Sequence, residues 1–154
     1  MIETPFITES TACTTACIHL VIPRAEMMHA FGPAIDALVA TLSEQGLSPA
    51  GPAFAHHFKI TPDTFDFEVG FATTALIAPA GRVKPGHAPA LKVARTVYHG
   101  PYEGLPAAWG EFDAWMQAHG LTQAEDLWEH YVTGPHTSPD PTTWRTELTR
   151  PLTS

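Results

Sequence analysis

Two stretches of the chain repeat apolar residues at the spacing of an amphipathic helix. Their stripes consist of Phe31, Ile35, Leu38 and Leu42, and of Leu105, Trp109, Phe112 and Met116. Steps of four and three residues place these side chains on one helical face, which can pack on a sheet. Pro33 and Pro106 suit the first turns of such helices, and Gly46 and Gly120 suit their ends. The pattern predicts helices over residues 31–45 and 105–119.

The two stripes and their terminal glycines are related by a constant offset of 74 residues. The same offset matches the strand-like runs 53–58 and 127–132, and an offset of 79 matches 65–69 with 144–148. Strand-like runs at 16–22 and 91–98 precede the two helices. We therefore expect two β-α-β-β repeats, over about residues 15–72 and 90–152, within one domain that spans residues 1–154.

The segment between the repeats predicts one additional strand, near residues 73–78. Proline and glycine residues after it, including Lys84-Pro85-Gly86, predict turns. Antiparallel hairpins with two main helices on one face place the fold in the α+β class.

The chain is acidic, because 8 Lys and Arg residues against 16 Asp and Glu residues give a formal net charge of −8. No basic cluster is present, so we expect no direct nucleic-acid binding, whereas cations or a basic protein surface would be attracted. No apolar run reaches the ~20 residues of a membrane span. Residues 1–15 contain no basic residue, whereas a secretory signal begins with a positively charged segment. We expect a cytoplasmic protein that does not enter membranes.

Neither the nine histidines nor the two cysteines show the spacing of a metal site. His56 and His57 are adjacent, so on a strand they point to opposite faces. Cys13 and Cys17 lack further ligands at regular spacing and are expected to be reduced thiols. We therefore predict no metal and no cofactor.

Four runs of residues around the duplication resemble the motifs of one family. They are Phe65-Asp66-Phe67-Glu68-Val69-Gly70-Phe71, Val97-Tyr98-His99-Gly100-Pro101-Tyr102-Glu103-Gly104-Leu105, Leu127-Trp128-Glu129-His130-Tyr131, and Trp144 to Leu152. Together they resemble the GyrI-like small-molecule-binding domain, the effector-binding domain that is also fused to DNA-binding parts of AraC- and MerR-type regulators. The resemblance covers about residues 15–152. Because some fifteen residues precede the first predicted strand, we expect a stand-alone form.

This resemblance implies a pseudo-symmetric antiparallel sheet that encloses a hydrophobic ligand groove. It also implies a buried Glu in many members, which attracts lipophilic cations. Some stand-alone members resemble hydrolases that open strained, cyclopropane-bearing toxins, and others resemble pure binders or gyrase modulators.

Glu129 is the first candidate for the functional site. Strand alternation places it on one face with Tyr131, and we expect Trp128 and Val132 to pack beneath the helices on the other face. Glu129 would then face the groove, where the first repeat has Ala55. A carboxylate in an apolar pocket is costly unless a cationic or hydrogen-bonding ligand pairs it. A solvated Glu on an exposed sheet face is the alternative that spacing alone leaves open.

Four ring-bearing side chains are further candidates for ligand contacts. Tyr131 and its repeat counterpart His57 would flank the groove, and Tyr98 and Tyr102 lie where the strand leads into the second helix. Aromatic rings form flat walls and hold cations by their faces. Tyr98 and Tyr102 fit ordinary packing at the rim equally well.

Three functions are compatible with these residues. The first is binding of a lipophilic, in some cases cationic, small molecule in an aromatic pocket with a central Glu, for sequestration or effector sensing. The second is hydrolysis of a strained electrophile, with Glu129 as general base and Tyr131 or Tyr102 polarising the leaving group. The third is docking of this acidic domain on a topoisomerase or regulator, and a homodimer is also compatible. We rank binding first and hydrolysis second.

Overall fold

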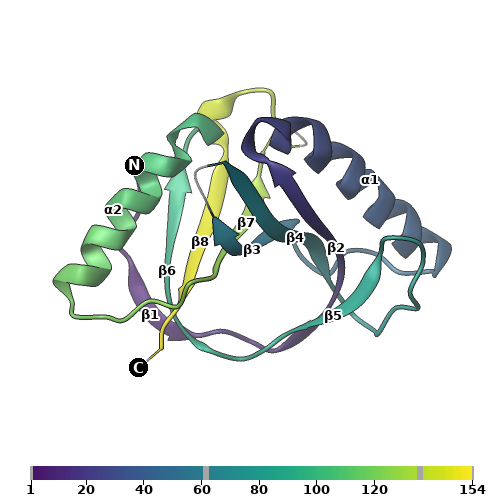
Figure 1. Ribbon diagram of the computed structural model, residues 1–154, viewed down its shortest axis with the longest axis horizontal. Coiled ribbons are helices and arrows are strands. Elements are labelled where there is room, and N and C mark those ends of the chain that lie inside the picture. Colours follow the sequence, from purple (N-terminus) through teal and green to yellow (C-terminus); the bar gives the residue numbers. More distant parts are fainter. Residues whose placement is uncertain (1, 61–62, 135–136, 154) are drawn as a thin grey trace. The chain divides into compact units, whose positions relative to one another are not determined.

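The computed structural model describes residues 2–60, 63–134 and 137–153. The chain forms two compact units: unit 1 contains Met1–Ser10 and Ala90–Ser154, and unit 2 contains Thr11–Pro89. Each unit has four antiparallel strands and one main helix (Figure 1). The predicted α+β class with two main helices is confirmed.

Unit 2 contains the first repeat. Its elements are β2 (Cys13–Pro23), a 3-10 helix (Arg24–Glu26), α1 (Met27–Glu44), β3 (Phe54–Ile60), β4 (Thr64–Thr73) and β5 (Lys84–Ala88). The strands are arranged in the order β3-β4-β2-β5, with antiparallel pairing throughout. α1 packs on β2 and β4, and Ala34, Leu38 and Leu42 of the helix are fully buried.

Unit 1 contains the second repeat. Its elements are β1 (Phe6–Glu9), β6 (Lys92–His99), the 3-10 helix η2 (Tyr102–Gly104), α2 (Leu105–Ala118), β7 (Leu127–Thr133), a 3-10 helix (Pro141–Thr143) and β8 (Arg145–Pro151). The strand order is β1-β6-β8-β7. Phe112 and Met116 of α2 are fully buried in a core with Leu148, and Leu105 and Trp109 pack against this core while remaining partly exposed.

The two helices end in the same way at the predicted offset. The amide of Leu47 donates to the carbonyl of Leu42 at 2.8 Å, and the amide of Leu121 donates to that of Met116 at 3.0 Å. The glycine before each of these leucines has a left-handed φ, of 71° and 66°. This pattern is a Schellman motif, in which the left-handed glycine turns the chain so that the amides after the helix donate to its last carbonyls. Equal caps at equal offset support the internal duplication.

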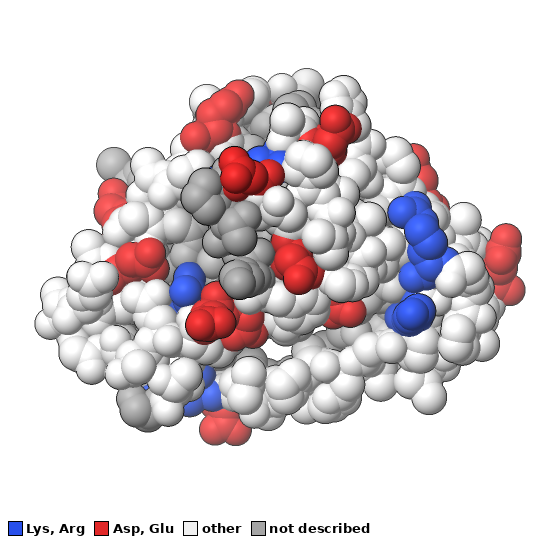
Figure 2. Space-filling model, viewed as in Figure 1, with Lys and Arg blue, Asp and Glu red and all other residues white. Residues whose placement is uncertain are grey.

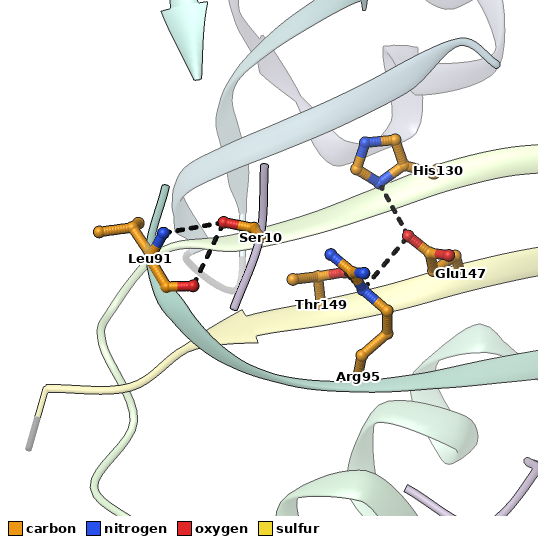
Figure 3. Close-up of polar contacts among 6 residues, drawn as sticks. All are labelled: Ser10, Leu91, Arg95, His130, Glu147 and Thr149. Carbon is orange, nitrogen blue, oxygen red and sulfur yellow. Dashed lines mark hydrogen bonds and ion pairs between the residues drawn. The ribbon is translucent and has the colours of Figure 1, made fainter. Parts of the chain in front are cut away.

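Each unit takes its edge strand from outside its own repeat. β1 comes from the N-terminus and pairs with β6, whereas β5 follows the first repeat and pairs with β2. The Ser10 amide donates to the Leu91 carbonyl at 2.8 Å. The Ser10 hydroxyl accepts a bond from the Leu91 amide at 2.9 Å and donates to the Leu91 carbonyl at 3.3 Å (Figure 3). These bonds extend the pairing of β1 with β6 at its end.

Two boundaries differ from the predictions. The additional strand lies at Lys84–Ala88 and not near residues 73–78. Pro85 was taken to indicate a turn, but β5 is an edge strand, where the missing N–H of proline costs no ladder bond. α1 begins at Met27, so Pro33 lies inside the helix and not in its first turn. Residues 27–30 contain neither Gly nor Pro, so the helix extends one turn further toward the N-terminus.

The surface carries the acidic character of the sequence. On the face drawn in Figure 2, acidic side chains are scattered among uncharged ones and basic side chains are fewer. Within the described residues, neither main helix has the length and apolar character needed to cross a membrane.

Candidate functional site

Glu129 is a buried carboxylate in the middle of β7, with 8% of its surface exposed. The indole Nε1–H of Trp109, on α2, donates to Glu129 Oε2 at 2.8 Å. The hydroxyl of Tyr131, two residues along the strand, donates to Oε1 at 2.7 Å. A helix and a strand therefore each supply one neutral donor, and the alternative of a solvated glutamate is wrong.

Burial dominates the electrostatics of this carboxylate. Desolvation raises the pKa of Glu129 above its ordinary value, and the hydrogen bonds from Trp109 and Tyr131 oppose that rise. Of the ion pairs found among the described residues, none includes Glu129. When ionised, this group therefore places a negative charge in the interior that dipoles stabilise but no cation neutralises.

The face of β7 that carries Glu129 is the opposite of the predicted one. The bond from Trp109 shows that Glu129 faces α2, so Trp128 and Val132 do not pack beneath the helix. Trp128 stacks on His130 on the other face with ring centroids 6.0 Å apart, and Val132 is 43% exposed at a β-bulge between its neighbours. Alternation was predicted correctly, but it does not indicate which of the two faces meets the helix.

Aromatic rings continue from Glu129 toward the start of α2. Tyr102, in η2, lies edge-on to Tyr131 with ring centroids 5.7 Å apart, and its ring centroid also lies 5.1 Å from that of Trp144. Burial and the charge of Glu129 raise the pKa of the Tyr102 phenol. Tyr131 is buried, and burial followed by the same charge raises its pKa well above the ordinary value. Both phenols are therefore neutral hydrogen-bond donors at neutral pH.

A cation lies near the indole of Trp109 rather than at Glu129. The guanidinium of Arg150 is 6.0 Å from the centre of the Trp109 ring, at the outer limit of a cation–π contact. Its Nε donates to the carbonyl of Ala124 at 2.9 Å. Burial lowers the pKa of Arg150, and the charges of Asp113 and Asp126 oppose that shift. Arg150 can therefore hold the indole in place without neutralising the Glu129 carboxylate.

Unit 2 carries different chemistry at the matching positions. Ala55 occupies the place of Glu129, and His57 occupies the place of Tyr131. His57 is 4% exposed, stacks on Phe67 at 4.9 Å and meets Phe65 edge-on at 5.3 Å. Its Nδ1 is buried and finds no hydrogen-bond partner among the described residues. Burial lowers the pKa of His57 to about 4, so the imidazole is neutral at neutral pH.

Tyr98, the remaining predicted contact residue, belongs to the core of unit 1. Its ring packs with Ala108 and Leu148, and its hydroxyl donates to the carbonyl of Pro101 at 2.8 Å. The structure therefore brings Glu129, Tyr131 and Tyr102 together, places Tyr98 beneath the segment that carries Tyr102, and places His57 in unit 2.

The opposite face of the unit 1 sheet carries a separate polar group (Figure 3). Arg95 Nε lies 3.4 Å from Glu147 Oε1 and donates to the hydroxyl of Thr149 at 3.3 Å, and His130 Nδ1 lies 3.8 Å from the same Glu147 oxygen. Burial lowers the pKa of His130 to about 4, so its ring is uncharged at neutral pH. Glu147 therefore has a charged partner already, unlike Glu129.

The family assignment follows from comparison with known proteins. A search of curated protein sequences finds no significant match. The family model described as the GyrI-like small molecule binding domain matches residues 3–153 of the chain. The chain belongs to the GyrI-like family. It is a small-molecule-binding domain of that type.

Solved structures share the fold of this GyrI-like domain. The EcmrR C-terminal domain has a TM-score of 0.87 at 18% identity, covering 98% of both chains. In the EcmrR–DNA complex the TM-score is 0.85 at 18% identity, over 97% of this chain and 57% of the EcmrR chain, so this chain spans just over half of EcmrR. A hydrolase from Listeria innocua has a TM-score of 0.70 at 12% identity, over 97% of this chain and 91% of the hydrolase. The structure of SAV2435 bound to tetraphenylphosphonium has a TM-score of 0.69 at 8% identity, over 99% of this chain and 95% of the SAV2435 chain.

Three residues near Glu129 and Tyr131 were not named as candidate functional residues from the sequence. Trp109 was assigned to the core stripe, and Trp144 and Thr146 to the closing strand. Thr146 lies opposite Tyr131 in the β7–β8 ladder, and its buried hydroxyl has no hydrogen-bond partner among the described residues. A position-by-position comparison of the two repeats could have pointed to Trp109. The second repeat has Trp109 in place of Ile35 and Glu129 in place of Ala55, so an indole donor and a carboxylate differ together.

A metal centre has no support in the described parts of this GyrI-like domain. Within residues 2–60, 63–134 and 137–153, no group of three His, Cys, Asp or Glu side chains is placed to hold an ion. Cys17 is buried with its thiol 3.2 Å from the Thr15 hydroxyl, and burial raises its pKa to about 11. This thiol is therefore protonated at neutral pH and a poor metal ligand.

Proposed function

We propose that this GyrI-like domain binds a lipophilic, positively charged small molecule at Glu129. The observation that carries the proposal is a buried carboxylate held by two neutral donors, with no ion pair among the described residues. Each carboxylate oxygen accepts one hydrogen bond and keeps a further lone pair. A ligand cation would supply the compensating charge that the protein itself does not place there.

The surroundings of Glu129 favour a lipophilic cation over a small hydrated one. Tyr131 and Tyr102 present neutral aromatic rings close to the carboxylate, and Trp109 presents an indole. Ring faces attract cations most strongly when the cation is desolvated, and a lipophilic cation loses little hydration on entering such surroundings. The tetraphenylphosphonium bound by the similarly folded SAV2435 is a ligand of this class and supports the choice of probe.

Calorimetric titration with tetraphenylphosphonium tests the proposal. We expect the wild-type domain to bind it, and Glu129→Gln to bind at least about tenfold more weakly, equivalent to ~1.4 kcal/mol. Glu111→Gln is the matched control, because it removes one negative charge from an exposed position of α2 in the same unit. Triphenylphosphine oxide, which carries no net charge, should bind wild type and Glu129→Gln with equal affinity. Equal affinity of wild type and Glu129→Gln for the phosphonium would exclude the proposed role.

The pH dependence provides a second measurement. Because burial raises the pKa of Glu129, the carboxyl keeps its proton to higher pH than an exposed glutamate does. Tetraphenylphosphonium does not titrate, so its affinity for wild type should rise with pH until Glu129 is fully ionised. The affinity of Glu129→Gln should stay flat over the same range.

Hydrolysis of a strained electrophile is the second candidate function. The observation that favours it is the 2.7 Å contact between the Tyr131 hydroxyl and the Glu129 carboxylate, with the Tyr102 ring beside Tyr131. A carboxylate with a raised pKa is a suitable general base for water, and a neutral phenol can polarise the leaving group. The Listeria innocua protein of similar fold is a hydrolase, which supports testing for this activity.

The two candidates respond differently to the same variant. A cyclopropane-bearing electrophile should be incubated with the domain and ring opening followed by mass spectrometry. If the domain is a hydrolase, Glu129→Gln should abolish turnover and still bind the substrate, because proton abstraction is lost while contacts remain. Absence of ring opening by the wild-type domain would leave binding as the function.

A further inference from the structure

The segment between β6 and α2 determines where the Tyr102 ring lies. This segment, residues 100–104, contains the 3-10 helix η2. It is short and has no side chain of its own in the core, yet Tyr102 is held between Tyr131 and Trp144. Its placement therefore depends on what fixes the backbone of residues 100–104.

One side-chain hydrogen bond and two backbone hydrogen bonds fix that backbone. The Pro101 carbonyl accepts two of them, from the Tyr98 hydroxyl at 2.8 Å and from the Gly104 amide at 3.1 Å. The Gly100 amide donates to the carbonyl of Trp144 at 3.0 Å. Tyr98 is the one side chain among these partners, and it is itself anchored in the core of unit 1.

The Tyr98 hydroxyl also occupies the space that side chains would take at both glycines of this segment. A Cβ on Gly104 would overlap the hydroxyl oxygen, and a Cβ on Gly100 would lie 2.9 Å from it. Gly100 additionally has a φ of 137°, a conformation that other residues rarely adopt. The phenol and the two glycines are therefore complementary in shape, and the backbone rests directly on the Tyr98 hydroxyl.

We propose that Tyr98 is a positioning residue of the ligand site, which holds residues 100–104 so that Tyr102 presents its ring beside Glu129. It acts through Tyr102 and does not itself contact the ligand. A ring held in place before binding loses less conformational entropy when the ligand arrives. The part of this inference that concerns ligands rests on the proposed function; the part that concerns the placement of Tyr102 does not.

The placement of Tyr102 can be measured without any ligand. The chain has three tyrosines, so a protein labelled with ¹³C at tyrosine Cζ gives three resonances that single Phe variants assign. In wild type, the pKa of Tyr102 should lie above the ordinary value of about 10 because of burial and Glu129. In Tyr98→Phe it should move toward the ordinary value, and the ring-to-ring NOE between Tyr102 and Tyr131 at neutral pH should weaken.

Thr96→Val is the matched control for this experiment. Thr96 lies on the same strand, is buried, and donates its hydroxyl to the backbone carbonyl of Glu3 at 2.7 Å. Its replacement removes one side-chain-to-backbone bond without touching residues 100–104, so the titration and the NOE of Tyr102 should match wild type. If Tyr98→Phe also matches wild type in both measurements, Tyr98 does not position Tyr102 and the inference is overturned.

A double-mutant cycle tests the route to the ligand. Tyr98→Phe should weaken tetraphenylphosphonium binding about fivefold, the usual scale for one lost hydrogen bond. In a Tyr102→Leu background the same change should have no effect on affinity, because its target is gone. A fivefold loss that persists in Tyr102→Leu would show that Tyr98 acts directly and would overturn the inference. If the wild-type domain does not bind the phosphonium, the proposed function fails. The ligand-free titration of Tyr102 still decides the role of Tyr98 in that case.

Discussion

The β7 strand of unit 1 and the β3 strand of unit 2 are equivalent strands of the two repeats but carry different chemistry. β7 presents Glu129 and Tyr131 toward α2, where Trp109 completes a set of three hydrogen-bonded groups. β3 presents Ala55 and His57 at the matching positions, and the buried Nδ1 of the imidazole has no hydrogen-bond partner in the part of the chain that the structure describes. The ladder register also shifts just after His57 in β3 and just after Tyr131 in β7, so the two backbones share this irregularity.

This difference shows that the repeated scaffold and the candidate site are separable. The scaffold needs apolar helix residues and alternating strands, and both units have them. The site needs a carboxylate together with its donors, and three coordinated substitutions between the repeats provide them in unit 1 alone. A single substitution would not suffice, because a carboxylate without donors would be a costly buried charge.

The largest expected effect concerns the part that the units share. Phe112→Ala in unit 1 and Leu38→Ala in unit 2 each remove a fully buried side chain at matching helix positions. We expect losses of about 3–5 and 2–5 kcal/mol in the free energy of unfolding, measured by urea denaturation. A loss below about 1 kcal/mol for either variant would show that its helix contributes little to the core.

The next effect tests whether unit 2 can accept the chemistry of unit 1. Ala55→Glu places a carboxylate at the position that matches Glu129. The counterpart of Trp109 in unit 2 is Ile35, which has no N–H to donate. We expect a loss of roughly 3 kcal/mol at pH 7, because the buried charge is incompletely paired. The nearby anion should also raise the pKa of His57, which NMR titration can follow. An unchanged urea midpoint would mean that unit 2 supports a carboxylate without the indole.

A smaller effect concerns the buried imidazole of unit 2. The pKa of His57 is lowered to about 4 in the folded protein, against an ordinary 6.5, so the unfolded chain binds the proton more readily. Folding stability should therefore fall as pH decreases through 6.5 toward 4, by roughly 2 kcal/mol between pH 7 and pH 5 for this group. His57→Phe keeps a ring on Phe67 and should remove that part of the pH dependence. The same slope in both proteins would contradict the assignment.

The smallest effect concerns one donor of unit 1. Trp109→Phe keeps an aromatic ring but removes the Nε1–H bond to Glu129, which should lower stability by about 1 kcal/mol at pH 7. The pKa of Glu129 should rise further, since that bond favours the charged form. Because a raised carboxyl pKa costs stability only above the ordinary value, the difference from wild type should shrink below pH 4. A difference independent of pH would mean that the indole acts by packing alone.

The residues of the candidate site were found in part from the sequence. Glu129, Tyr131 and Tyr102 were candidates, and the structure brings these three together. Trp109 was missed because its spacing fits the apolar stripe of α2, and periodicity does not reveal that an indole N–H at the edge of a stripe meets a carboxylate. The ligand contacts of all five candidates, Glu129, Tyr131, Tyr102, Tyr98 and His57, stay predictions, and for Tyr98 we propose that it positions Tyr102 instead.

The sequence by itself determined the local elements and their repetition. Helix stripes, glycine caps and alternating strands depend on neighbours within a few residues, so their pattern is visible in one dimension. Only the tertiary structure decided which face of β7 meets α2 and that β1 and β5 serve as edge strands. Both depend on backbone hydrogen bonds and packing between segments far apart in the chain, and alternation is equally satisfied by either face. The buried charge of Glu129 is a consequence of that choice of face.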